Sequence, residues 1–467
     1  MKNCKPIEIR VGDLKPALVG LGKITRPSAP DAVLRCIRVE RANKSEIRLQ
    51  ATDGDFHLNL KAPAKVIDPV EPFLVPLEAL REQVRGCKAA DSVLIRPNAK
   101  APAVSEFPGP PAFRAASVEL PPKITSSLLR AFACSSSDPS RFVLQGAYLD
   151  VSGKGRNAHR IVATDGRQLF SSNSMELSSL KSSVILPNHV LWKWKRMTAE
   201  VPWILRVGAE KGGDAPFRIS TKDWSLSGKT ISGNYPNYRQ VIPPGSDFKS
   251  RAEMSREVAE AIANLIPKLP GKKLSNKPVG LHIEKGLVSL LARETTEEPW
   301  QFYPIGPVKA EGPDQVVFAN RDYVQRATGF GLTSISTTDQ QSPMQFSREG
   351  DLMIVMPVRV GDTEKLKRPR KLAPIVSTKQ PKSPQSPAKK AVSKKRATAP
   401  PATSDPMDEI EVSIAEANKA LASAGKKLKS AKGSLNTARD QRTEDQEELK
   451  GFRSLFRSIK KLATGSN

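Results

Sequence analysis

The stretch Ser227–Thr230 reads Ser-Gly-Lys-Thr, which is how a phosphate-binding loop ends. Such a loop also needs a glycine five positions before Gly228, so that its backbone N–H groups can surround a phosphate. Asp223 stands at that position, and Trp224 and Leu226 alternate with polar residues as strand residues do. The sequence therefore favours a strand here, and a nucleotide-using enzyme built on this stretch is the weakest of our three hypotheses.

Metal chemistry has little support in the sequence. Asp53 and Asp55 could form a carboxylate pair, but they stand beside Gly54 between two alternating runs, where a hairpin turn is the simpler interpretation. The four histidines have no ligand spacing among them, and no nucleophile elbow or dinucleotide loop is present. We therefore expect no catalytic residue, no metal and no cofactor. The histidines are His57, His159, His189 and His282.

The charge of the chain points to a polyanionic partner. The formal net charge is +26 and the isoelectric point is near 9.9, which favours nucleic acid without separating DNA from RNA or an acidic membrane. Four cysteines lack a Cys-x-x-Cys spacing, and no run of 18 apolar residues occurs, so we expect reduced thiols, no membrane segment and a cytoplasmic, nucleoid-associated protein. The cysteines are Cys4, Cys36, Cys87 and Cys134.

The elements that would position any site come from a long internal repeat. Ala51–Gly54 reads Ala-Thr-Asp-Gly, and 163–166 reads the same; 73–76 similarly returns as 184–187. A third, more divergent copy begins with the helix-like stretch 254–266 and ends with the apolar run 316–319. A period above 100 residues is a repeat of whole domains rather than of solenoid units.

Each repeat predicts an α+β domain of antiparallel strands and a few helices. Ile47, Leu49 and Ala51 alternate up to the Asp-Gly turn, and the alternation resumes at Phe56, which is typical of a hairpin. Similar hairpins are expected around 152–155 and 284–286, and helices at 13–21 and 123–132. The predicted domains are 1–117, 118–247 and 248–360.

The last hundred residues have a different composition. Residues 361–405 are rich in Lys, Pro and Ser, which predicts a disordered basic linker. Residues 406–463 carry apolar side chains at heptad spacing, beginning with Ile414, Leu421 and Leu428, and predict a coiled-coil-like helix. A lone amphipathic helix with one buried face fits the same pattern.

Several motifs together resemble the bacterial sliding clamp, the beta subunit of DNA polymerase III. They are Leu144-Gln145-Gly146, the stretch from Val162 to Leu169, the stretch from Asn234 to Pro243, and Val355-Met356-Pro357-Val358-Arg359. The resemblance covers residues 1–360 and implies three clamp-type domains with antiparallel sheets outside and helices inside. It also implies head-to-tail dimers whose six domains close a ring around duplex DNA, which fits a chain without a base-reading motif.

The resemblance further implies an apolar pocket, between the second and third domains, for a short peptide with a Leu-Phe anchor. Aliphatic residues and Met suit an ordinary core as well, so packing is the alternative for part of this set. Arg167 and Gln168 depart from the family's usual His-Arg, so the preferred partner can differ. The predicted pocket residues are Leu144, Thr164, Gly166, Arg167, Leu169, Pro236, Val241, Met356, Pro357 and Val358.

Two further sets of residues follow from the resemblance. Arg26 and Arg141 are expected to contact DNA, although a solvated surface charge is the simpler role for any single arginine. The ring interface is expected to pair the first domain with the third. Its predicted residues are the basic Arg96 and Lys100, the acidic Glu294, Glu297 and Glu298, and the apolar Leu265, Ile266 and Leu274.

Three functions are therefore carried forward. The first is a non-catalytic DNA sliding clamp that tethers a replicative polymerase and other replication or repair proteins. Its expected partners are double-stranded DNA, the catalytic subunit of the polymerase, a clamp-loading ATPase and a second copy of the chain. The second is a clamp-like DNA-binding scaffold that is not loaded and recruits partners through its C-terminal helix. The third is the nucleotide-using enzyme.

Overall fold

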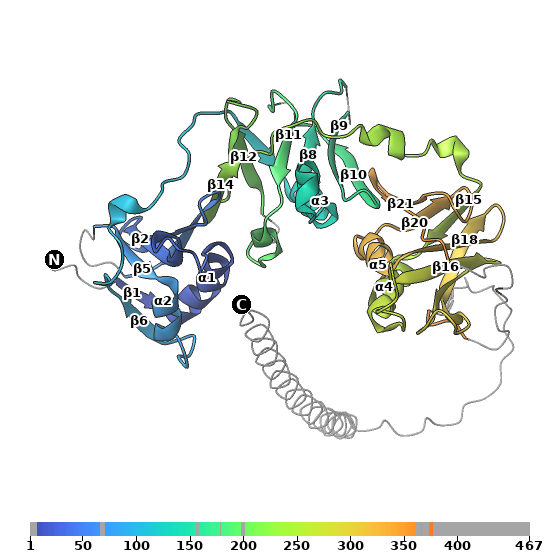
Figure 1. Cartoon of the computed structure of the whole chain (residues 1–467), viewed down its shortest axis with the longest axis horizontal. Coiled ribbons are helices and arrows are strands. Elements are labelled where there is room, and N and C mark those ends of the chain that lie inside the picture. The colour runs from blue at the N-terminus through green and yellow to red at the C-terminus, as the bar shows by residue number, and fades with distance from the viewer. Residues whose placement is uncertain are drawn as a thin grey trace, which may run out of the picture. The chain divides into compact units, whose positions relative to one another are not determined.

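The computed structural model describes residues 7–65, 71–155, 158–177, 179–197, 201–360, 366 and 373–376. All of them belong to one compact unit, residues 1–381, and many of its elements are labelled in Figure 1. The helix predicted for 406–463 and most of the linker predicted for 361–405 lie outside the described residues.

The first repeat is built on a helix that buries one face. Leu14, Leu18 and Leu21 fall at helical spacing and are fully or almost fully buried, and the helix lies on strands β3 and β4. The predicted hairpin is confirmed, with Leu49 opposite Leu60. Its elements are β1 (Ile7–Arg10), α1 (Val11–Ile24), β2 (Cys36–Arg41), β3 (Glu46–Thr52), β4 (His57–Pro63), β5 (Phe73–Pro76), α2 (Leu77–Gln83) and β6 (Ser92–Ile95).

The second repeat follows the same order and adds two strands at its end. The helix begins with Pro122 at its first turn, where a missing N–H costs nothing, and packs on β8, β9 and β10. Leu149 pairs with Ile161, as the second predicted hairpin requires. The elements are β7 (Ser117–Leu120), α3 (Pro122–Cys134), β8 (Gly146–Asp150), β9 (His159–Thr164), β10 (Gln168–Met175), β11 (Val184–Pro187), β12 (Trp203–Val207), β13 (Pro216–Ser220) and β14 (Trp224–Lys229).

The third repeat is complete as well. Its first helix starts two residues later than predicted, because Met254 ends a strand and the Ser255 hydroxyl caps the helix by accepting the N–H of Val258. Ile283 pairs with Val288 in the third predicted hairpin. The elements are β15 (Ser250–Met254), α4 (Arg256–Leu265), β16 (Pro278–Glu284), β17 (Leu287–Ala292), β18 (Gln301–Glu311), β19 (Gln315–Asn320), α5 (Arg321–Gly329), β20 (Ser334–Thr337), β21 (Met344–Arg348) and β22 (Asp351–Val355).

Antiparallel sheets run from each repeat into the next. In the first sheet β4 of repeat 1 pairs with β14 of repeat 2, in the strand order β5-β2-β3-β4-β14-β13-β12-β7. In the second sheet β10 of repeat 2 pairs with β22 of repeat 3, in the order β11-β8-β9-β10-β22-β21-β20-β15-β18-β17-β16-β19. The α+β class and the layout in three repeats are thereby confirmed. Strands β4, β10 and β18 are equivalent, because each is the third strand after the first helix of its repeat. The first residues of β4 and β10 pair with β14 and β22, and the first residues of β18 are the equivalent position for a neighbouring strand.

Within 7–65 and 71–117, the described part of repeat 1, the two strands that form such a neighbour are absent. In repeats 2 and 3 the strands β12 and β20 are followed by a hairpin, whose second strand, β14 or β22, makes the junction. In repeat 1, β6 pairs with β1 in a sheet of two strands, and residues 97–116 contain one short helix, η2 (Val104–Glu106), and no strand. This segment packs on repeat 1 through Val104 and Phe107, and its Phe113 ring lies 5.6 Å from the Arg218 guanidinium of repeat 2.

Of the residues beyond Val360, those that the structure describes, Leu366 and 373–376, contact repeat 3. Leu366 packs with Val360 against a cluster around Trp300, and the N–H groups of Ile375 and Val376 donate to carbonyl oxygens of β18. The apolar side chains of Leu366 and Val376 account for these contacts. Most of the segment lies outside the described residues, so the disordered linker over 361–405 stays a prediction. Within the described residues no helix is long and apolar enough to cross a membrane.

Candidate functional site

An apolar cavity of about 210 Å³ lies at the junction of β10 and β22. Its walls come from the end of the short helix η3 (Pro139–Leu144), the turn between β9 and β10, the short helix η5 (Tyr238–Val241) and the end of β22. The structure brings eight of the ten predicted pocket residues together here. They are Leu144, Thr164, Gly166, Arg167, Leu169, Pro236, Val241 and Met356.

The other two predicted residues do not line this cavity. After Met356 the chain runs beside β19 of the same repeat, where Val358 donates its N–H to the Phe318 carbonyl at 2.7 Å and Pro357 forms a bridge with Ala319. Pro357 and Val358 are therefore tied to β19. Four lining residues were missed by the sequence reasoning: Gln168, Asn237, Tyr238 and Ile354.

Strand alternation explains why one junction supplies both a pocket and a core. Successive side chains of a strand point to opposite faces. Leu169 pairs with Ile354 in a small apolar cluster that also lines the cavity, whereas the next residue, Phe170, pairs with Met353 and is fully buried in the main core.

The turn between β9 and β10 is held by its own side chains. Asp165 accepts the N–H groups of Arg167 and Gln168 at 2.8 and 3.0 Å, and the Thr164 hydroxyl accepts the N–H of Gly166 at 3.0 Å. Gly166 has φ +87°, a left-handed conformation that a side chain would strain. The recurring Ala-Thr-Asp-Gly motif thus encodes a turn that presents Arg167 at the rim of the cavity.

The opposite wall is fixed by a buried carboxylate. Tyr238 donates its hydroxyl to Asp150 at 2.7 Å, and the Arg239 guanidinium lies 2.8 Å from the same oxygen. Burial alone would raise the pKa of Asp150, but the hydrogen bonds from Ser152 and Tyr238 and the charge of Arg239 outweigh it and hold the pKa below its usual range. The short helix η5 is therefore attached to β8 through Asp150.

Replacing Tyr238 with Phe is expected to lower the free energy of unfolding by about 1–2 kcal/mol at pH 7, because a buried carboxylate loses one donor. The folded-state pKa of Asp150 is depressed, so its stabilising contribution is present above the unfolded-state pKa and is lost as pH falls through the folded-state value. The difference from wild type should therefore shrink as pH falls below about 4, the ordinary pKa of an aspartate, toward the lower folded-state pKa. Urea unfolding at several pH values measures this.

Tyr303→Phe is the matched control, because the Tyr303 hydroxyl donates to the exposed side chain of Gln301. This change should leave the unfolding free energy within about 0.5 kcal/mol of wild type at every pH. An equal loss in both variants would show that Asp150 does not hold η5.

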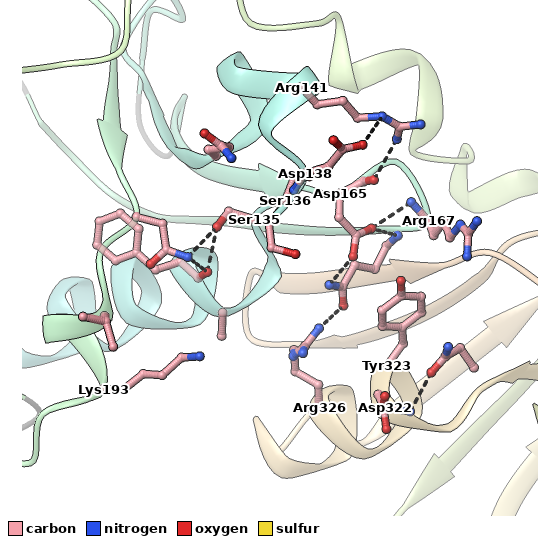
Figure 2. Close-up of a pocket in the computed structure, with 18 of the residues that line it drawn as sticks. Ser135, Ser136, Asp138, Arg141, Asp165, Arg167, Lys193, Asp322, Tyr323 and Arg326 are labelled. Atoms are coloured by element: carbon pink, nitrogen blue, oxygen red, sulfur yellow. Dashed lines mark hydrogen bonds and ion pairs between the residues drawn. The ribbon is translucent and has the colours of Figure 1, made fainter. Parts of the chain in front are cut away.

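A second, larger and more polar cavity of about 880 Å³ lies on the other side of the same turn (Figure 2). Arg167 and Gln168 line both cavities, so the turn is their common wall. The Arg326 guanidinium from α5 donates to the Gln168 side chain at 2.6 Å and so ties the turn to repeat 3. The side chains that line this cavity carry charges of both signs. The basic ones are Arg141, Arg167, Lys193 and Arg326, and the acidic ones are Asp138, Asp165 and Asp322.

The comparisons with known proteins agree on one fold. The chain is 17% identical to a sliding clamp, DNA polymerase III subunit beta, from Bartonella birtlesii bound to griselimycin, with a TM-score of 0.63 over 76% of this chain and 100% of that chain. It is 19% identical to the beta sliding clamp of C. crescentus, with a TM-score of 0.63 over 77% and 100% of the two chains. The chain has the fold of the bacterial sliding clamps.

Sequence similarity to curated proteins covers less of the chain. The beta sliding clamp of Haemophilus influenzae is 25% identical over 215 residues, which are 44% of this chain and 55% of that protein. The beta sliding clamp of Pseudomonas aeruginosa is 29% identical over 148 residues, or 31% and 38% of the two chains. The chain thus spans about half the length, or less, of these curated relatives. No protein-family model matches the sequence.

Within this clamp fold the two predicted DNA-contacting arginines occupy equivalent places. The Arg26 guanidinium lies 3.6 Å from Asp53, and the Arg141 guanidinium donates to the backbone carbonyl of Asp165 at 3.1 Å. Each arginine is therefore beside the Thr-Asp-Gly turn of its own repeat. Their side chains are 54% and 53% exposed, so both remain accessible to a phosphate.

The residues predicted for the ring interface lie on repeats 1 and 3, and some of them make contacts within the chain. Glu294 accepts the N–H of Gly271 at 2.8 Å, and Glu298 interacts with Thr295 and Arg293. Ile266 is buried in the core of repeat 3. Leu265 and Leu274 are partly buried, Glu297 is exposed, and Arg96 and Lys100 are exposed on repeat 1.

The first three residues of the stretch that ends like a phosphate-binding loop lie in strand β14, and Thr230 follows it. A side chain at Gly228 would meet the rings of Phe56 and Phe217 at about 3.1 and 3.2 Å, so the glycine makes room for aromatic packing. Lys229 lies 3.3 Å from Asp214. The strand interpretation is confirmed.

The Asp53 carboxylate serves the turn before β4. It accepts the N–H groups of Asp55 and Phe56 at 3.1 and 2.8 Å, as the turn interpretation predicts. Among the described residues no group of three or more His, Cys, Asp or Glu could hold a metal ion. Cys36, Cys87 and Cys134 are free, and burial raises the pKa of the Cys134 thiol to about 12.

Proposed function

We propose that this protein is a non-catalytic DNA clamp that tethers other replication or repair proteins to duplex DNA. The observation that carries the proposal is the apolar cavity at the β10–β22 junction, formed in a clamp fold by eight residues predicted from the family resemblance. A cavity of this size, with apolar walls and a few polar groups at its rim, suits one or two large apolar side chains of a peptide.

The expected partners are a DNA polymerase catalytic subunit, a clamp-loading ATPase and a second copy of the chain. Sequence-independent phosphate contacts would come from Arg26, Arg141 and the net charge of +26. The domain boundaries that go with this proposal are 1–117, 118–247 and 248–360, followed by the basic linker 361–405 and the helix 406–463.

The deciding experiment compares retention on DNA of two topologies. Full-length protein is incubated with nicked circular DNA, excess salt is added, and the bound protein is measured before and after the circle is cut. Retention on the circle and loss after cutting supports enclosure. Equal retention on both supports the second candidate, the clamp-like scaffold.

One observation favours that second candidate. The described residues of repeat 1 include no counterpart of the hairpins β13–β14 and β21–β22, although those hairpins make both junctions within the chain. A scaffold that binds DNA without closing on itself would need no third junction. Binding of a peptide to the apolar cavity is common to both candidates.

Replacing both Arg26 and Arg141 with Ala is expected to weaken DNA binding several-fold and to reduce the slope of log affinity against log salt by about 1 for each arginine. Fluorescence anisotropy with a labelled duplex at 50 to 200 mM salt measures this. Lys229→Ala is the control, since Lys229 has a side chain that is 68% exposed on β14. An unchanged slope in the double variant would show that these two arginines do not contact DNA phosphates.

A further inference from the structure

The only charged side chain among the described residues that line the apolar cavity is that of Arg167. It is exposed and stands on the turn between β9 and β10, whose backbone is held by Asp165. The same side chain also lines the larger polar cavity on the other side of the turn (Figure 2). A ligand whose apolar groups fill the first cavity therefore meets a cation at its rim.

The guanidinium of Arg167 has a neutral partner. Its Nη1 donates to the side chain of Asn276 at 3.2 Å, and within the part of the chain that the structure describes it forms no ion pair with a carboxylate. An amide oxygen carries no net charge, so this hydrogen bond leaves the positive charge of Arg167 uncompensated. A carboxylate is the stronger acceptor for a guanidinium, because both groups are then charged and two parallel hydrogen bonds can form.

The three carboxylates that line the polar cavity already have partners. Asp165 accepts N–H groups of its own turn. Asp138 lies 3.7 Å from the guanidinium of Arg141. Asp322 lies 2.8 Å from the ammonium group of Lys277. Among the described residues of the cavity, no carboxylate is therefore left to neutralise a further cation.

A second arginine faces the polar cavity from α5. Arg326 donates to the neutral side chain of Gln168 and also forms no ion pair with a carboxylate of the described residues. Burial, together with a hydrogen bond to Asp165, raises the pKa of the Tyr323 hydroxyl to about 12, and the positive charges of Arg167 and Arg326 oppose this rise. Both guanidinium groups thus act on one point of the cavity, the Tyr323 hydroxyl.

We propose that the peptide bound in the apolar cavity carries an acidic residue within about three positions of its apolar anchor, and that Arg167 selects this residue by an ion pair. The inference rests on the proposed function, because it names the chemistry of the peptide that the same cavity binds. The arrangement favours a peptide over duplex DNA. A ligand that fills the apolar cavity and touches Arg167 needs large apolar side chains and an anion together, whereas a DNA backbone supplies the anion alone.

The test uses the full-length chain and two labelled peptides, each with capped ends and a central Leu-Phe pair. One peptide carries Glu two positions away on either side of this pair, and the other carries Gln at both places. At about 50 mM salt, fluorescence anisotropy should show that the Glu peptide binds about fivefold more tightly. At about 500 mM salt this preference should shrink, because the charges at the rim are screened.

Two substitutions that remove one positive charge each provide a matched pair. Arg167→Gln keeps the backbone N–H that Asp165 accepts, and should lower the affinity for the Glu peptide about fivefold and that for the Gln peptide by less. Lys285→Gln is the control, because the Lys285 side chain is 84% exposed in the turn between β16 and β17, and it should keep the full preference. An equal loss in both variants would trace the preference to the net charge of the chain and overturn the role of Arg167.

The possible failures of this inference and of the proposed function differ in the same assay. Equal affinities of the wild-type chain for the two peptides would overturn the inference and leave the peptide site intact. Binding of neither peptide would contradict the proposed function and the inference together. If Arg167→Gln instead lowers the salt dependence of duplex binding and keeps the preference between the peptides, Arg167 contacts DNA phosphate and the inference is wrong.

Discussion

Replacing Val241 with Asp is expected to weaken the binding of a Leu-Phe peptide by at least about 30-fold, the loss typical of a residue that dominates an interface. Val241 lies at the end of η5 on the wall of the apolar cavity and is 39% exposed. A carboxylate there would have to lose its hydration when an apolar side chain enters, without gaining a partner. Fluorescence anisotropy with a labelled peptide measures the affinity.

The control for this substitution is Val201→Asp. Val201 is 40% exposed, nearly the same as Val241, but it lies just before β12 and does not line the cavity. Neither substitution should change the thermal midpoint by more than a few degrees, since both side chains are already partly in solvent. If Val241→Asp binds the peptide as well as Val201→Asp does, the cavity is not the peptide site.

The pattern of the sequence was sufficient to predict the repeats and their hairpins. Alternation at Ile47, Leu49 and Ala51 places these residues on the buried face of β3, and the same two-residue period marks β8 and β16. The Asp-Gly turns were predictable for the same local reason, because Asp53 and Asp165 each bind backbone N–H groups two and three residues ahead.

Only those pocket residues that stand in the recognised sequence motifs could be predicted. Ile354 enters the cavity because β22 pairs with β10 in one particular register, and no local pattern fixes a register across 185 residues. Tyr238 was missed for a similar reason, since its role depends on Asp150, 88 residues away. Pro357 and Val358 belong to the same motif as Met356, but their backbone pairing with β19 holds them away from the cavity.

The sequence of repeat 1 itself indicates that it lacks this hairpin. Residues 97–116 contain five prolines, and a proline cannot donate a backbone hydrogen bond to a neighbouring strand. The equivalent segments of repeats 2 and 3 alternate apolar and polar residues instead, as in Phe217–Ile219 and Phe346. The contact of Ile375 and Val376 with β18 could not be predicted, because they are two apolar residues within a basic, proline-rich segment.

The largest expected effect on stability comes from Phe170→Ala. Phe170 is fully buried in the middle of the β10–β22 junction, and its ring meets Phe330 of α5 edge to face at 5.7 Å. Removing the ring deletes a large apolar surface and leaves a cavity that the two paired strands cannot fill, so the loss should be about 3–5 kcal/mol. Urea unfolding of the full-length chain measures it, with Phe142→Ala as control because Phe142 is 54% exposed.

The same substitution tests whether the core and the peptide cavity share one junction. Leu169 lines the cavity and Phe170 fills the core, and adjacent residues of one strand cannot shift independently. A loosened junction would therefore move Leu169 away from Ile354, and Phe170→Ala should weaken peptide binding even under conditions in which the variant is fully folded. Wild-type affinity in a folded Phe170→Ala variant would show that the cavity is formed by η3, η5 and the turn at Gly166 without support from the pairing of β10 with β22.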